Sequence, residues 1–176
     1  MTSRAQHLRR CTVVVAVCVG ALTTIATINS LRWIDKPFPG FFLLANRVIP
    51  SISLPDWGPI SAHFQGQVLA VNGQPVDTSA AVYHLVRAQP PGTELTYTIR
   101  GTDGNTYDTV HPSRQFSRTD YLFLFGAYVL SGVAFLAAGL TVFWLMPYNP
   151  ASIGLLCCGG TLGIFAITGL DLYWPH

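Results

Sequence analysis

Three long runs of the chain carry no charged residue, and a polar middle separates the first run from the other two. The runs lie between Cys11 and Ile28, between Tyr121 and Met146, and between Ile153 and Leu170. Each is close to, or longer than, the roughly 18 to 20 apolar residues that cross a bilayer. The pattern therefore predicts three transmembrane helices, over residues 11–30, 121–146 and 153–172.

The charges before the first run predict the orientation of these helices. Arg4, Arg9 and Arg10 lie among the first ten residues, which contain no acidic side chain. The positive-inside rule then places residues 1–10 and the short turn 147–152 in the cytoplasm, and residues 31–120 outside the membrane. A cleaved secretory signal is the alternative for the first run. The retained anchor is favoured because the run is long for a signal and no clean Ala-x-Ala site follows it.

The polar middle, residues 31–120, predicts a small α+β domain. Alternation and β-branched residues predict strands over "FFLLANRVI", "GPISAHF", "GQVLAVNG", "ELTYTIR" and "TYDTVHP". Asn72-Gly73 predicts a tight turn, since both residue types tolerate positive φ. A helix is expected over residues 79–88, capped by Asp77, Thr78 or Ser79, with Val82, Leu85 and Val86 on one face.

Composition removes several classes of function. A net charge of +2 with no basic cluster argues against nucleic-acid binding. All four cysteines lie in the uncharged runs, so the middle has neither a disulfide framework nor the sulfur ligands of a Cys/His metal site. No metalloprotease, nucleophile-elbow or phosphate-loop motif organises the scattered histidines and carboxylates. We therefore expect no enzyme activity, no catalytic residues, no metal and no cofactor.

The middle resembles a bacterial PDZ-like domain over roughly residues 57–112. The residues that carry the resemblance form an ordered series: Gly66, Val68, Val71, Asn72, Gly73, Pro75, Val76, Pro91, Gly92 and Thr93. Gln67 stands where the family usually has an acid. The upstream segment "LPDWGPISAHFQG" has no recognisable Gly-Leu-Gly-Phe-like loop, so reading of a peptide C-terminus is not expected.

The resemblance implies a groove that binds a peptide as an added strand beside the helix. Its candidate lining residues are Ile60, Ala62, Phe64, Val82, His84 and Val86. For His84 a solvated position is favoured over a ligand-reading role. Arg87 is likewise expected to face solvent.

The arrangement of one anchor, an outer domain and a helical hairpin is similar to the N-terminal sensory region of multi-span bacterial signalling proteins, such as histidine kinases or serine phosphatases. That resemblance implies a plasma-membrane sensor that binds a peptide or protein outside the cell membrane and acts on its helices. The alternatives are a membrane-tethered structural or assembly adaptor, and a regulatory remnant of a PDZ-bearing protease. A groove filled by the chain's own residues favours the adaptor.

Small residues are spaced for close helix packing in the second and third runs. Gly159 and Gly163 form a Gly-x-x-x-Gly spacing, and Gly132 and Gly139 lie in the second run. Such spacings allow helices to approach closely in lipid. The sequence leaves two outcomes open: a homodimer through the transmembrane helices, or packing within one chain.

Overall fold

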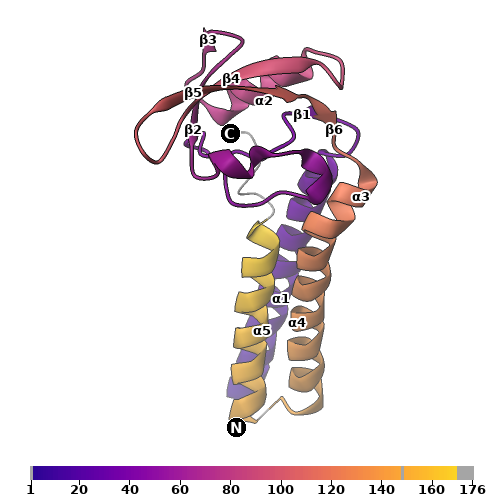
Figure 1. Ribbon diagram of the computed structural model, residues 1–176. Helices are drawn as coiled ribbons and strands as arrows, with labels where there is room; N and C mark the ends of the chain where they lie inside the picture. The colour runs from indigo at the N-terminus through magenta and orange to yellow at the C-terminus, as the bar shows by residue number, and fades with distance from the viewer. Residues whose placement is uncertain (1, 148, 170–176) are drawn as a thin grey trace. The chain divides into compact units, whose positions relative to one another are not determined.

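The computed structural model describes residues 2–147 and 149–169, and it divides into two compact units (Figure 1). The described part of the helical unit is residues 2–32 and 122–169, and that of the sheet unit is residues 33–121. The fold is thus mixed α+β, with long apolar helices in one unit and a small sheet in the other.

The helical unit contains α1 (Thr2–Leu31), a π-helical turn η3 (Leu122–Gly126), α4 (Ala127–Leu145) and α5 (Pro150–Thr168), and Figure 1 shows α1, α4 and α5 side by side. Two helical segments, Val13–Leu31 and Arg118–Leu145, are long and apolar enough to cross a membrane. The apolar part of α5, Pro150–Phe165, is shorter, and residues 170–172 of the third predicted span lie outside the described residues.

Glycines bring α4 and α5 into close contact within the chain. A Cβ on Gly159 would lie 2.6 Å from the carbonyl oxygen of Phe135, and one on Gly163 would lie 3.1 Å from that of Gly132. A Cβ on Gly139 would lie 3.1 Å from Cα of Leu156. Because residue numbers rise on one helix as they fall on the other, the two helices are antiparallel. The Gly-x-x-x-Gly face of α5 is therefore occupied by α4.

The sheet unit contains two sheets. Its strands are β1 (Pro37–Phe38), β2 (Gln67–Val71), β3 (Gln74–Pro75), β4 (Glu94–Arg100), β5 (Thr106–Pro112) and β6 (Arg114–Gln115). The larger sheet has the order β3-β2-β4-β5 and is antiparallel, while β1 pairs with β6. Two 3₁₀ helices, η1 (Pro55–Trp57) and η2 (Ile60–His63), precede β2, and α2 (Ser79–Arg87) connects β3 to β4. A short α3 (Arg118–Tyr121) ends the unit.

The predicted local features of this unit are largely confirmed. Asn72 (φ 50°) and Gly73 (φ 76°) form the turn between β2 and β3. Thr78 caps α2 by accepting a hydrogen bond from the Ala81 N–H at 3.1 Å. On β4 the predicted inner face is buried: Leu95, Tyr97 and Ile99 are all at most 2% exposed.

Two predicted strands are wrong. "GPISAHF" forms the 3₁₀ helix η2 instead of a strand. Gly58, at φ 91°, turns the chain just before it, and Pro59 has no N–H to offer a ladder. "FFLLANRVI" is irregular apart from a single bridge between Val48 and Gln67. Arg47, at φ 65°, interrupts the extended run there.

Candidate functional site

The face of α2 on which the sequence placed a groove is buried. Val82 and Val86 are fully buried, and the neighbouring Tyr83 is 1% exposed. Leu85, expected on the same face, is only half-buried, while His84 is exposed. The buried face is thus centred on Val82, Tyr83 and Val86.

The chain's own segment 33–43 lies against this helix. The backbone N–H of Leu43 donates to the Tyr83 hydroxyl at 2.9 Å, and both groups are buried. The rings of Trp33 and Tyr83 meet edge to face, with centroids 5.1 Å apart, and Phe42 packs on Trp33 in the same way at 5.4 Å. All four of these side chains are at most 1% exposed. Aromatic and main-chain groups of the chain therefore occupy the space beside Tyr83.

Arg87, in the last turn of α2, was expected to face solvent but is half-buried. Its guanidinium lies over the rings of Trp33 and Tyr83, 5.5 and 5.9 Å from their centroids. Burial lowers the pKa of Arg87, and Tyr83 opposes that change. Nε and Nη2 are buried with no hydrogen-bond partner among the described residues. Cation–π contact and the nearby C-terminal end of the helix dipole both favour the charged guanidinium.

The other three candidate groove residues lie around η2. Ile60 is 1% exposed, Ala62 is exposed and Phe64 is half-buried. Because Ile60 and Ala62 belong to a 3₁₀ helix, their backbone offers no extended edge to an added strand. The role of all six candidates in peptide binding stays a prediction.

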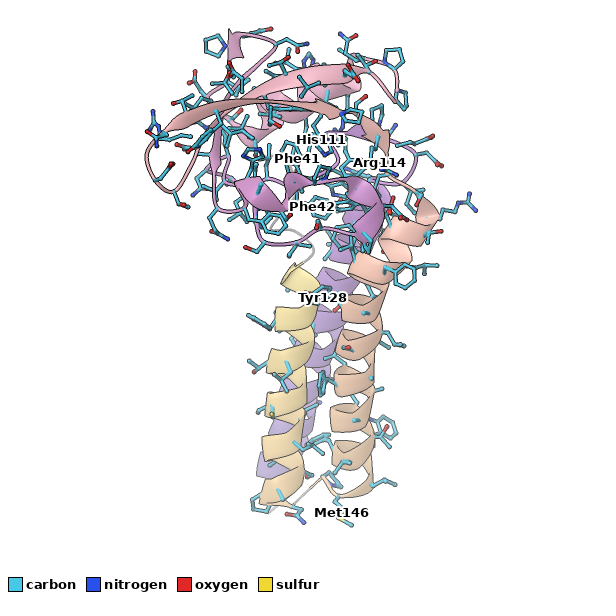
Figure 2. The ribbon with its side chains drawn as sticks, in the orientation of Figure 1. Phe41, Phe42, His111, Arg114, Tyr128 and Met146 are labelled. Carbon is cyan, nitrogen blue, oxygen red and sulfur yellow. The ribbon has the colours of Figure 1, made fainter. Side chains whose placement is uncertain are left out.

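His111 fixes two glycine turns in the sheet unit. A Cβ added to Gly40 would lie 2.7 Å from Cε1 of His111, and one added to Gly58 would lie 3.2 Å from Nε2, so a side chain would clash with the ring at Gly40 and crowd it at Gly58. The Phe41 ring meets the imidazole edge to face at 5.9 Å, and Figure 2 shows these two residues as neighbours. Burial lowers the pKa of His111, and the positive charge of Arg114 lowers it further. Hydrogen bonds to nearby carbonyls, such as that of Pro112, act in the opposite direction and raise the pKa.

β5 is an edge strand of the larger sheet, and no strand of the described residues pairs with its outer side. At the two ends of the β4–β5 pair, Gly101 N–H donates to Asn105 O and Ser113 N–H donates to Thr93 O, both at 2.8 Å. These bonds show which residue pairs of the ladder are hydrogen-bonded. Bonding alternates along an antiparallel pair, so Tyr107, Thr109 and His111 bond to β4. The N–H and C=O groups of Thr106, Asp108 and Val110 therefore point away from the sheet. Val110 is 57% exposed and Tyr107 is 43% exposed.

The described residues contain no group of three or more His, Cys, Asp or Glu side chains placed to hold a metal ion. Sequence reasoning missed the roles of Leu43, Tyr83, Arg87 and His111. The one usable signal was that Tyr83 directly follows Val82, so a slightly rotated apolar face of the helix includes it. The contacts of His111 had no local signal, because its partners lie more than 50 residues earlier in the chain.

No protein-family model matches the chain, and no curated protein has a matching sequence.

Proposed function

We propose that the chain is a non-catalytic, membrane-anchored assembly adaptor whose PDZ-like sheet unit lies outside the membrane and docks on a partner protein. The observation that carries this proposal is the filled face of α2. Val82 and Val86 are fully buried, and Leu43 bonds directly to Tyr83. A peptide sensor of the expected kind needs open side-chain pockets along this helix.

Membrane anchoring is supported by the apolar surface of the helical unit. Along α1 the exposed apolar side chains include Val13, Val14, Val15, Val17, Leu22, Ile25, Ile28 and Leu31, and along α4 they include Leu130, Phe135, Trp144 and Leu145. Helices whose outward side chains are apolar over this length suit lipid. We propose that α5 completes a third crossing, because its glycine face holds it tightly against α4.

Orientation is tested by labelling intact cells. In a variant whose four cysteines are replaced by alanine, Thr102→Cys in the exposed β4–β5 turn should react with an impermeant maleimide. Asn149→Cys, in the exposed turn between α4 and α5, is the matched control and should react only after permeabilisation. Release of the chain by alkaline extraction, or the reverse labelling pattern, contradicts the proposal.

The choice between adaptor and sensor is tested with peptides selected on the solubilised full chain. His84 is exposed on α2 and belongs to the candidate groove residues, so a peptide held in the predicted groove would contact it. The adaptor predicts that His84→Glu leaves the affinity of every selected peptide unchanged. A loss of about tenfold would favour the sensor.

A further inference from the structure

We propose that the outward edge of β5 is the docking edge of the sheet unit and that its occupant is β5 of a second copy of this chain, paired antiparallel. This inference rests on the proposed adaptor function and names its partner. The two strands would form one continuous sheet across the pair of chains.

The main chain of β5 is arranged for such pairing. Thr106, Asp108 and Val110 direct their N–H and C=O groups outward, because the ladder to β4 uses the residues between them. An open row of donors and acceptors is a template for another strand.

The two edges of the sheet differ in how well they are protected. On the far side β3 is only Gln74–Pro75, and a short strand ending in proline is a poor template. β5 spans Thr106–Pro112 and pairs with β4 without a register shift. It contains no lysine, and its single proline is the last residue of the strand. The exposed Val110 adds apolar surface to this edge. Of the two edge strands, β5 is therefore the better template for pairing with another strand, and β3 is the poorer one.

Side-chain chemistry selects one register of the paired strands. A two-fold axis through Asp108 would set two carboxylates directly opposite each other, which is unfavourable. An axis through Thr109 places the two Thr109 residues opposite each other as a non-hydrogen-bonded pair and sets Asp108 against Val110 of the second copy. Both residues of this latter pair have outward main-chain groups, so each such pair forms two hydrogen bonds.

Charge complementarity favours a second copy over an unrelated strand. The turn that precedes β5 carries Asp103, with Asp108 on the strand, whereas Arg114 lies just beyond its other end. Antiparallel pairing brings the acidic end of each strand toward the basic end of the other. Anchoring in one membrane also raises the effective concentration of copies, so a small interface suffices.

The register is tested by disulfide cross-linking of the full chain in lipid vesicles, with the four native cysteines replaced by alanine. Thr109→Cys places two thiols opposite each other across the axis and should give an oxidised dimer. Thr106→Cys is the matched control on the same strand. In this register it faces Pro112 of the second copy and should stay monomeric.

The edge itself is tested by sedimentation of the detergent-solubilised chain. Val110→Pro removes an outward N–H that the β4 ladder does not use, and Val110→Lys adds a charge to the edge. Both should weaken dimerisation about tenfold or more. Fluorescence of the buried Trp33 and Trp57 reports whether the sheet unit stays folded.

A dimer that resists both Val110 substitutions, a monomer at every concentration, or stronger cross-linking at position 106 than at 109 overturns the inference. In each case a chain that remains membrane-integrated with Thr102 outside leaves the proposed adaptor function standing. If alkaline extraction releases the chain from the membrane, the proposed adaptor function is wrong, whatever the result at β5.

Discussion

The backbone N–H of Leu43 donates to the hydroxyl of Tyr83 at 2.9 Å, across 40 residues of sequence and inside the core. This bond joins the segment before the sheet to the helix that the sequence had assigned to a peptide groove. It satisfies a buried main-chain donor that no strand partner serves, since residues 41–44 form no ladder. Closure of the α2 face therefore depends on a polar contact as well as on aromatic packing.

Removal of this hydroxyl should destabilise the sheet unit. Tyr83→Phe leaves the Leu43 N–H buried without an acceptor, so we expect a loss of about 1–3 kcal/mol in the free energy of unfolding. The measurement is denaturant unfolding of the solubilised full chain, followed by tryptophan fluorescence.

Tyr97→Phe is the matched control. The Tyr97 hydroxyl is buried with no hydrogen-bond partner among the described residues, and burial raises its pKa. Its removal should leave stability unchanged or raise it. A loss at Tyr97 equal to that at Tyr83 would contradict the assignment of the Leu43 bond.

The contact between His111 and Gly40 should be detectable by adding one methyl group. Gly40 and Gly104 both have φ 81°, so alanine suffers the same backbone strain at either position, about 1 kcal/mol. At Gly104 the added Cβ meets nothing within 4 Å, whereas at Gly40 it would lie 2.7 Å from the His111 ring. Gly40→Ala should therefore cost about 1–3 kcal/mol more than Gly104→Ala in chemical denaturation. Equal costs would show that the ring moves aside freely.

Burial of His111 should make the sheet unit less stable in acid. Its folded-state pKa lies below the ordinary value of 6.5, so the unfolded chain binds more protons as the pH falls below that value. The stabilising contribution is complete above pH 6.5 and is lost as the pH falls through the lowered folded-state pKa.

Melting temperatures measured as a function of pH test this prediction. His111→Gln should have a shallower decline than the unsubstituted chain. Parallel curves for the unsubstituted chain and His111→Gln would contradict it.

The α4–α5 hairpin offers adjacent glycines with opposite surroundings. A Cβ at Gly159 meets the Phe135 carbonyl oxygen at 2.6 Å, whereas one at Gly160 meets nothing within 4 Å. Gly159→Ala should destabilise the hairpin by about 1–3 kcal/mol, and Gly160→Ala should not. Loss of helicity during titration with a denaturing detergent measures both. If the Gly-x-x-x-Gly face served a homodimer instead, dilution would reproduce the effect of Gly159→Ala.

Local sequence signals predicted much of the sheet unit. Asn72-Gly73, the Thr78 cap and the alternation along β4 each act within a few residues, so their outcome depends little on distant contacts. The segment before β2 could not be predicted in this way. Its irregular path is fixed by contacts such as that of Trp33 with Tyr83 and that of Gly40 with His111, which have no periodicity.

The candidate site was predicted only in part for the same reason. The sequence identified Val82 and Val86 as one apolar face, but a buried helix face and a ligand groove have the same residue pattern. What covers that face is the segment containing Leu43, which precedes the region of resemblance. The edge position of β5 likewise depends on strand order, because no local pattern shows which strand lies outermost.

The closed face of α2 is tested most directly by comparing thiol reactivity at two positions of that helix in the full chain free of native cysteines. Val86→Cys lies on the fully buried face and His84→Cys lies on the exposed one. Our account predicts that the thiol at position 84 reacts rapidly with a small maleimide under native conditions, while the thiol at position 86 reacts only when the sheet unit unfolds. Rapid native labelling at position 86, in a chain whose tryptophan fluorescence shows it to be folded, would mean that the groove is open and would contradict the account.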